Sequence, residues 1–433
     1  MPEDKTDIQL EQITTNLDWN GSDQMAKNLV YAQSGGVTPV INASAYGVIS
    51  AALNSNAVYK VYAAKNGIQG ILDEELFVLN EEKKEEIEKM AYTPGGVFGS
   101  CRIKIETEEQ LKRVFSVFEA HDIGYFLYNG GNDSMETAFS VSEYAKKNGY
   151  DLKVFGIPKT VDNDLMYTDH CPGYGSAAKF TATAILEATR DLKSMSASST
   201  KVFLMESMGR HAGWLAASGA LAHEVEESAA SIILMPEVAF SKEKFLSRIE
   251  EEIIKNGFCS IVASEALKDE NGSFLSNAGY TDTFGNVQLG KISNVLEKMI
   301  RDELKIKIHT ALPDYLQRSS RHIASLTDWQ DAIEVAARAV LWMTRESMTG
   351  KMVSIIRDMD KPYIRHFEQV DLSHVAGETK ILPKDFIDES GYNVTEKFRN
   401  YARPLIIGET PNQYMYGVPM YTKLSYQLEK KLL

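Results

Sequence analysis

Residues 29–53 read LVYAQSGGVTPVINASAYGVISAAL, and this stretch sets a pattern that the rest of the chain repeats. An apolar run of strand length (29–32) is followed by a glycine turn and then by a stretch of helix length (37–53). Short runs rich in β-branched and aromatic residues are typical of buried parallel strands. A strand, a glycine turn and a helix in this order predict one unit of a parallel α/β sheet.

The same alternation predicts further strands and helices along the chain. The predicted strands are residues 58–64, 125–128, 154–157, 202–205, 231–235 and 260–263, and the predicted helices are residues 108–121, 134–147, 175–193, 242–256 and 329–348. With 433 residues the chain is too long for one ordinary core. We therefore expect an α/β fold of two doubly wound domains, with mainly parallel sheets and helices on both faces.

Composition and charge argue against several classes of protein. There are 46 Lys and Arg residues against 60 Asp and Glu, a net charge of −14 that repels nucleic acid. No apolar run approaches the roughly 20 residues needed to cross a bilayer, and the acidic N-terminus does not resemble a secretory signal. The three cysteines, Cys101, Cys171 and Cys259, have no CxxC spacing. We expect a cytoplasmic protein that binds neither nucleic acid nor membranes.

Four unusual stretches end predicted strands: YAQSGGV (31–37), YNGGNDS (128–134), GIPKTVDND (156–164) and MESMGRHAGW (205–214). The carboxyl ends of parallel strands lie on one edge of a sheet, where ligands bind. We therefore expect these four turns to converge in space.

Two of these turns have the chemistry of a phosphate site. Gly35 and Gly36 leave backbone amides free to approach a phosphate, although a tight turn alone would explain them. The second turn carries Asp133, a carboxylate that either holds a divalent cation or repels phosphate. Arginines also follow glycine-containing or polar turns, at Arg102, Arg210 and Arg318. Any one of them could be a surface ion-pair partner, but three of them indicate a site for two phosphorylated ligands.

The most specific stretch is PKTVDND, residues 158–164. Asp162 and Asp164 stand two residues apart, with Lys159 just upstream. A general base that deprotonates a hydroxyl needs such a carboxylate, and a second acid assists through a metal or hydrogen bonds. The alternative is a purely structural turn, because Asp and Asn also favour turns and caps.

Seven motifs, SGG, GGVFGSCR, GGND, PKTVDND, ESMGRHAGW, SEAL and YLQRS, occur in the order and approximate spacing of the phosphofructokinase family. Over about residues 28–320 the chain resembles the pyrophosphate-dependent branch of that family. The resemblance implies reversible phosphorylation of fructose 6-phosphate by pyrophosphate, with Mg²⁺ as cofactor, in glycolysis and gluconeogenesis. It also implies a homodimer or homotetramer with shared active sites.

The resemblance implies a role for each matching residue. Asp162 corresponds to the general base for the sugar 1-hydroxyl, and Asp164 to an acid that supports the base and the metal region. The residues implied around the transferred phosphoryl group and pyrophosphate are Thr160, Gly35, Gly36, Arg102, Arg210, Lys159 and Asp133. Those implied around the sugar phosphate are Met208, Gly209, Arg210, Glu265, Tyr315, Arg318 and, from a neighbouring subunit, Lys201.

Two positions imply the phosphoryl donor. ATP-using members resemble GGDGS and PGTIDND, where this chain has Asp133 and Lys159. The Asp should clash with and repel the inner phosphate of a nucleotide, whereas the Lys can bind the free end of pyrophosphate. The alternatives are an ATP-dependent phosphofructokinase, a related kinase that also uses sedoheptulose 7-phosphate, and a non-catalytic regulatory member of the fold.

The chain departs from the family pattern at three places. Asn132 stands where most members have a Mg²⁺-associated Asp, which leaves open whether Asn132 or Asp133 serves the metal. His309 stands near the position of a sugar-phosphate arginine, which Lys307 or another residue could replace. Val37 replaces an Asp that is common after SGG.

The resemblance also implies domain boundaries. Residues 1–27 are expected to form an N-terminal extension. Residues 28–172, completed by about 318–385, are expected to bind the phosphoryl donor, and residues 173–317, completed by about 386–433, the sugar phosphate.

Overall fold

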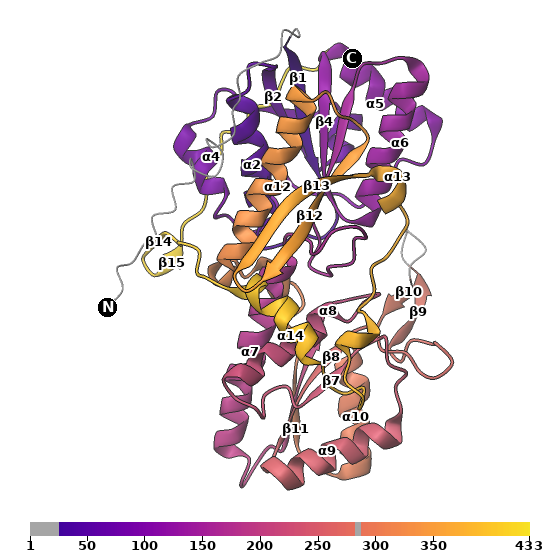
Figure 1. Ribbon diagram of the computed structural model, residues 1–433, viewed down its shortest axis with the longest axis vertical. Coiled ribbons are helices and arrows are strands. Elements are labelled where there is room, and N and C mark those ends of the chain that lie inside the picture. Colours follow the sequence, from indigo (N-terminus) through magenta and orange to yellow (C-terminus); the bar gives the residue numbers. More distant parts are fainter. Residues whose placement is uncertain (1–25, 282–286) are drawn as a thin grey trace.

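The computed structural model describes residues 26–281 and 287–433 and arranges them around two sheets (Figure 1). The larger sheet consists of Lys27–Gln33 (β1), Val58–Ala64 (β2), Leu76–Val78 (β3), Ile123–Gly130 (β4), Lys153–Pro158 (β5), Lys351–Asp360 (β12) and Tyr363–Asp371 (β13). Their order is β13-β12-β5-β4-β1-β2-β3. The five central strands are parallel, and β3 and β13 pair antiparallel at the two edges.

The second sheet consists of Val202–Ser207 (β6), Ile232–Leu234 (β7), Cys259–Ser264 (β8) and Ile308–Ala311 (β11). Its order is β11-β6-β8-β7, and all neighbours are parallel. Figure 1 shows this sheet below the larger one. Two small antiparallel pairs lie outside both sheets, Asn277–Thr281 (β9) with Val287–Leu289 (β10), and Tyr414–Met415 (β14) with Val418–Pro419 (β15).

Helices cover both faces of the larger sheet and flank the smaller one (Figure 1). The α-helices are Ile41–Leu53 (α2), Ile68–Leu72 (α3), Lys84–Met90 (α4), Glu108–Ala120 (α5), Asn132–Asn148 (α6), Tyr174–Met195 (α7), Trp214–Ser218 (α8), Lys242–Asn256 (α9), Ile292–Leu304 (α10), Leu316–Ser319 (α11), Leu326–Arg345 (α12), Leu372–Val375 (α13) and Glu396–Ala402 (α14). Short 3₁₀ turns are Gly219–Glu224 (η1), Arg321–Ile323 (η2), Lys384–Phe386 (η3) and Arg403–Ile406 (η4). Among the described helices, none has the length and apolar character required to cross a membrane.

Helix α12 comes from late in the chain but packs in the core of the larger sheet. It lies against α2, and this contact requires Gly47, because a Cβ there would lie 2.4 Å from the Ile333 carbonyl oxygen. Trp329 of α12 is fully buried and donates a hydrogen bond to the Ala91 carbonyl. The larger half of the molecule is therefore completed by residues far from it in sequence.

The predicted α/β architecture is confirmed, and each predicted strand and helix is present within a few residues. The helix predicted at 37–53 begins only at Ile41, because residues 37–40 form the turn in front of it. The β12–β13 hairpin and β11 were not predicted. At least every second residue of β13 is exposed to solvent. The strand therefore lacks the continuous apolar run on which the prediction of the other strands depends.

The C-terminal part of the predicted domain division needs a correction. Side chains between Phe386 and Leu405 pack in a core with Trp214 and Val262 of the second sheet's half. The last residues instead return to the larger sheet, where Val78 N donates to Gln427 O and Glu429 N to Leu76 O. Edge strand β3 offers unpaired backbone groups, which the tail satisfies. The predicted N-terminal extension lies outside the described residues, apart from its last two.

Candidate active site

The loop after β5 presents the two predicted acids. Lys159 N donates to Gly130 O at 3.1 Å, so strand pairing with β4 continues one residue beyond β5. Asp162 N then donates to Thr160 Oγ1 at 3.1 Å. Asn163 is buried with φ of 55°, a left-handed conformation that Asn tolerates. Its side chain donates to the Tyr401 hydroxyl and accepts from Cys171 N. These bonds fix the loop, so that Asp162 and Asp164 flank a rigid residue.

The environment of the two acids favours proton uptake. Burial raises the pKa of Asp162, and the neighbouring carboxylates Asp164 and Glu265 raise it further, against the opposing effect of Lys159 and Arg210. Burial also raises the pKa of Asp164. A carboxylate whose pKa is raised toward neutrality is a stronger base than an ordinary one.

Three cationic side chains gather around Gly36. Lys159 donates to the Gly36 carbonyl at 2.7 Å. A Cβ on Gly36 would lie 2.7 Å from Arg318 Nη1 and 4.0 Å from Arg102 Nη2. Burial lowers the pKa of Lys159 to about 8, helped by Arg318 and Arg102. The Nε of Arg318 is buried without a hydrogen-bond partner among the described residues. Such uncompensated positive charge suits a compact polyanion.

The arrangement corrects the predicted role of the Gly35 amide. Gly35 N donates to the Cys101 carbonyl at 2.9 Å, so in this conformation it does not point to a ligand. The residue has φ of 78°, and Lys159 Nζ lies 3.4 Å from where its Cβ would be. Gly35 therefore serves the site by giving the Lys159 side chain room.

The two residues at the start of α6 face different partners. Asn132 Nδ2 donates to Asp164 Oδ2 at 3.4 Å, and Asn132 Oδ1 is buried without a partner in the described structure. Asp133 is 60% exposed and forms an ion pair with Lys104 at 2.7 Å. In this structure Asn132, and not Asp133, therefore lies beside the acidic loop. No group of three or more His, Cys, Asp or Glu residues suited to a metal occurs in residues 26–281 and 287–433.

The second sheet contributes the turn after β6. Gly209 has φ of 129°, its amide donates to Glu265 Oε1 at 3.2 Å, and its carbonyl accepts from Ser264. Met208 N donates to the Gln317 side chain at 3.1 Å. Arg210 lies close enough to affect the pKa of both Asp162 and Glu265. The structure thus brings the turn at 205–214 to the loop at 156–164, from the opposite half of the molecule.

Lys201, His309 and Tyr315 do not join the residues that gather around the acidic loop. Lys201 precedes β6, at the end opposite to Met208, and its backbone N donates to Lys307 O. His309 pairs with Phe203 near that same distant end. Tyr315 is 66% exposed, and its ring lies 4.1 Å from the Arg318 guanidinium carbon. Within one chain Lys201 and His309 do not reach the acidic loop, since six strand residues span roughly 20 Å.

Comparison with known protein families agrees with the site described above. The sequence profile described as phosphofructokinase matches residues 28–343. The chain belongs to the phosphofructokinase family.

Its similarity to individual members extends over nearly the whole chain. Proteins from Halomonas elongata and Xanthomonas campestris, both named pyrophosphate–fructose 6-phosphate 1-phosphotransferase, are each 47% identical over 94% of this chain and 98% of their own length. The crystal structure of a pyrophosphate-dependent phosphofructokinase from Marinobacter aquaeolei has 45% identity and a TM-score of 0.86, covering 94% of this chain and 98% of that one. The corresponding structure from Nitrosospira multiformis, with the same coverage, has 43% identity and a TM-score of 0.88.

Sequence reasoning missed one buried contributor to this phosphofructokinase-family site. Gln317 is only 1% exposed, and by accepting from Met208 N it ties the YLQRS segment to the turn after β6. Its position between Tyr315 and Arg318, two residues that were singled out, was the only signal in the sequence.

Substituting Gly36 by Ala is expected to weaken pyrophosphate use while the protein still folds. The added Cβ would meet Arg318 Nη1, the far end of a flexible side chain, which can move aside. We expect KM for pyrophosphate to rise about threefold to tenfold, as for a partly lost charged contact, with the melting temperature unchanged. Steady-state kinetics and thermal melting of Gly36→Ala and wild type measure both. An unchanged KM would show that Arg318 does not contact pyrophosphate.

Proposed function

We propose that this chain transfers a phosphoryl group from pyrophosphate to the 1-hydroxyl of D-fructose 6-phosphate, producing fructose 1,6-bisphosphate and orthophosphate. The observation that carries the proposal is the group formed by Lys159, Arg102 and Arg318 around Gly36, which lies beside the Asp162 loop. The names of relatives that are 47% identical over nearly the whole chain support the same donor and acceptor.

Asp162 is the proposed general base. The sugar 1-oxygen attacks the terminal phosphorus of pyrophosphate, and its proton passes to the Asp162 carboxylate. The bond between that phosphorus and the bridging oxygen breaks, and orthophosphate leaves with the bonding electrons. In the reverse direction the protonated Asp162 returns the proton to the sugar oxygen. Because the two phosphoryl linkages have comparable transfer potentials, the reaction runs both ways.

The cations do most of the remaining catalytic work. Phosphoryl transfer depends chiefly on positioning and on neutralising the charge of the transferred group. Lys159 and Arg102 are assigned to the pyrophosphate and Thr160 to the transferred group. Arg318 was expected at the sugar phosphate, but because it lies beside Gly36 it is assigned to the pyrophosphate instead. Arg210 lies near enough to the Asp162 and Glu265 carboxylates to affect the pKa of both, and it is assigned to the developing charge on the sugar side.

The proposed cofactor is Mg²⁺, held by Asp164 and Asn132. Both offer oxygen atoms, which Mg²⁺ prefers, and the buried Oδ1 of Asn132, which has no hydrogen-bond partner in the described structure, is suited to a cation. When bound, the ion neutralises part of the pyrophosphate charge. Magnesium commonly takes only one or two protein carboxylates together with phosphate oxygens and water, which agrees with this small set of ligands.

Asn132→Asp is expected to tighten Mg²⁺ binding without abolishing activity, because it adds a carboxylate beside Asp164. Titrating Mg²⁺ in the orthophosphate-release assay should give half-maximal activity at a lower concentration than wild type. Asp151→Asn, at an exposed carboxylate before β5, is the control and should leave the titration unchanged. An unchanged Mg²⁺ dependence in Asn132→Asp would put residue 132 outside the reach of the metal.

The direct test of the proposed function is orthophosphate release. The purified chain is incubated with Mg²⁺ and either pyrophosphate or ATP, each with fructose 6-phosphate or sedoheptulose 7-phosphate. Release that requires both pyrophosphate and fructose 6-phosphate supports the proposal. Activity with ATP alone would identify an ATP-dependent kinase, and inactivity with every pair would identify a non-catalytic member of the fold.

The two halves are proposed to divide the substrates. The half with the larger sheet, residues 28–172 with about 318–385, would bind pyrophosphate, and residues 173–317 with about 386–406 the sugar phosphate. The site of action is proposed to be the cytoplasm, in agreement with Cys101, Cys171 and Cys259 all being free thiols.

We also propose that active sites are shared between subunits, because Lys201 lies too far from Asp162 within one chain to serve the same site. Lys201→Ala and Asp162→Asn are each expected to be inactive alone. When the two variants are mixed and reassembled as dimers, about half of the dimers contain one chain of each variant. Such a dimer has one intact site out of two, so about a quarter of wild-type activity should return. An active monomer in sizing experiments would contradict this prediction.

A further inference from the structure

One segment crosses between the two halves of the molecule at the active site. Residues 376–383, here called the crossing segment, connect α13 beside the larger sheet to η3 in the other half. Figure 1 shows the chain running from α13 down to the lower sheet. No motif of the sequence drew attention to it. Its Lys380 contacts elements from both sides.

On the side of the larger sheet, Lys380 binds the acidic loop. Its backbone N donates to the Asp164 carbonyl at 2.8 Å. Its ammonium donates to the carbonyl oxygens of Thr168 at 3.0 Å and Asp169 at 2.9 Å, and it lies 3.5 Å from Asn163 Oδ1. One side chain therefore gathers the residues that follow Asp162, including the Asn163 whose bonds fix the loop.

On the other side, Lys380 binds the turn that carries Arg210. Trp214 Nε1 donates to the Lys380 carbonyl at 3.1 Å, and the ammonium lies 5.1 Å from the centre of the Trp214 ring. Two residues on, Leu382 N donates to Glu237, which also accepts from Gly213 N. Trp214 begins α8 only four residues after Arg210. Lys380 is thus bonded to both segments that supply charged groups to the site.

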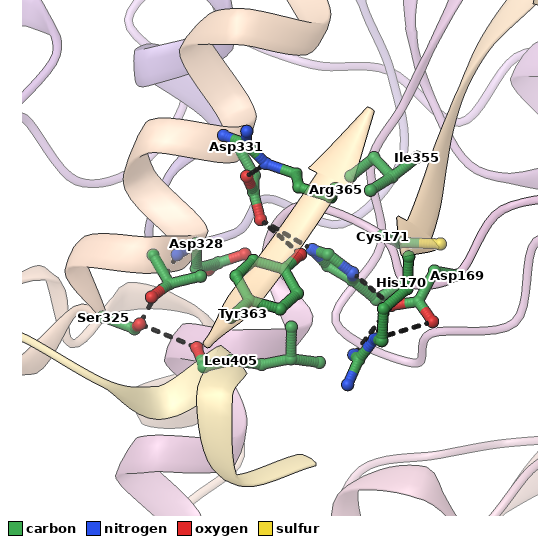
Figure 2. A network of polar contacts seen from close by, with 12 residues as sticks. Asp169, His170, Cys171, Ser325, Asp328, Asp331, Ile355, Tyr363, Arg365 and Leu405 are labelled. Carbon is green, nitrogen blue, oxygen red and sulfur yellow. Dashed lines mark hydrogen bonds and ion pairs between the residues drawn. The ribbon is translucent and has the colours of Figure 1, made fainter. Parts of the chain in front are cut away.

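The far end of the acidic loop has a separate anchor. Figure 2 shows His170 between the Asp169 and Asp331 carboxylates, with Arg365 on the other side of Asp331. Both His170 nitrogen–oxygen distances are 2.9 Å. These contacts hold residues 169 and 170 to α12 and to the β12–β13 hairpin. The His170 contacts do not touch the second half. Across the site, Lys380 shares the connection with Tyr401 of α14, whose hydroxyl accepts from Asn163 and donates to the Asp169 carbonyl.

We propose that Lys380 is a positioning residue for the phosphoryl transfer, which holds the 162–164 loop and the 208–214 turn in a fixed relation. The inference rests on the proposed function, since it concerns the alignment of Asp162 with Arg210. Removing the ammonium takes a donor from the Thr168 carbonyl and one of two donors from the Asp169 carbonyl, and it removes the contact of the charge with the Trp214 ring. The backbone bonds of Lys380 to Asp164 and Trp214 remain, so the loop loosens without coming apart. A displacement of about 1 Å between reacting groups can lower a rate by about 10²-fold.

The test compares Lys380→Met, which keeps the length of the side chain but removes its donors, with Lys380→Arg, which keeps the charge. Lys384→Met, an exposed lysine just beyond the crossing segment, is the matched control. For Lys380→Met we expect kcat to fall about tenfold to a hundredfold, with KM for both substrates within about threefold of wild type. Lys380→Arg should recover part of kcat, and Lys384→Met should match wild type.

Amide hydrogen exchange provides a readout that does not depend on activity. In Lys380→Met, exchange should become faster in residues 163–171 and 211–215 and stay unchanged in the β1 and β4 strands. Faster exchange throughout the chain, a wild-type kcat, or unchanged exchange in residues 163–171 would each overturn the inference. If Lys380→Met does not fold, Lys380→Gln is measured instead against the same outcomes. A wild-type chain that releases no orthophosphate overturns the proposed function, whereas the exchange result still reports whether Lys380 anchors the loop.

Discussion

Asp162→Asn is expected to lower kcat by about 10²–10⁴ while KM for both substrates stays near the wild-type value. The asparagine keeps the size of the side chain and its hydrogen bonding but cannot accept the proton of the sugar hydroxyl. The pKa of Asp162 is raised by burial and by the neighbouring Asp164 and Glu265 carboxylates. This raised pKa favours Asp162 as the base of the pair. Initial rates of orthophosphate release at saturating substrates give kcat directly.

Two comparisons make this result specific to the base. Asp151→Asn changes an exposed carboxylate before β5 in the same way and should keep the wild-type rate. Thermal melting of Asp162→Asn should match or exceed that of wild type, because the variant removes a buried charge that faces other carboxylates. Near-normal turnover in Asp162→Asn would mean that the base is another residue.

Lys159→Gly is expected to lower kcat/KM for pyrophosphate by about tenfold to a hundredfold without admitting ATP, since a lost charge-assisted contact is worth about 1.5–3 kcal/mol. Lys159→Met, which keeps most of the buried volume, separates charge from packing and should be as poor as Lys159→Gly. Equal kcat/KM in wild type and Lys159→Met would show that the ammonium does not bind the donor.

The same lysine predicts a pH effect. Burial and the neighbouring arginines lower the pKa of Lys159 to about 8. Below that pH the side chain is charged and attracts pyrophosphate, whereas above it the charge is lost. KM for pyrophosphate should therefore rise between pH 7 and pH 9 in wild type. Ionisation of the substrate and the metal also changes KM with pH, and it does so equally in wild type and in Lys159→Met. The part of the rise in KM that is due to Lys159 should therefore be absent from Lys159→Met.

Asp133 is the second residue proposed to determine the choice of phosphoryl donor. It is mostly exposed and paired with Lys104, and not with the acidic loop. Asp133→Gly removes both the side chain and its charge, and should admit ATP while leaving part of the pyrophosphate activity. Undetectable ATP use in this variant would mean that Asp133 does not exclude the nucleotide.

The sequence was sufficient for the elements that follow local rules. Buried parallel strands are continuous apolar runs, and their carboxyl ends had to share an edge, so the approach of residues 31–37, 128–134 and 156–164 followed directly. The β12–β13 hairpin escaped prediction because β13 has no fully buried residue, and in β12 the buried run Met352–Ile355 is followed by partly buried and exposed residues. The contacts of Arg318 with Gly36 and of Lys380 with Asp164 join segments more than 200 residues apart, and no local pattern encodes them.

Site roles that depend on side-chain direction were also beyond the sequence. Asn132 and Asp133 are adjacent at the start of a helix, where a rotation of about 100° per residue sends neighbours in different directions. The structure turns Asn132 to Asp164 and Asp133 to Lys104. Motif matching places both residues at the site but cannot tell which of them faces the acidic loop.

Because β12 lies late in the sequence, it affects how the protein folds during translation. β5 ends at residue 158, but the strand that pairs with it begins only at residue 351. At a synthesis rate of 5–20 residues per second, the edge of β5 waits roughly 10–40 s for its partner on the ribosome, and the face of α2 that α12 covers waits roughly 14–55 s. A nascent chain with an open strand edge is prone to aggregate. The core of the larger sheet therefore cannot be completed until residues 326–360 have been made.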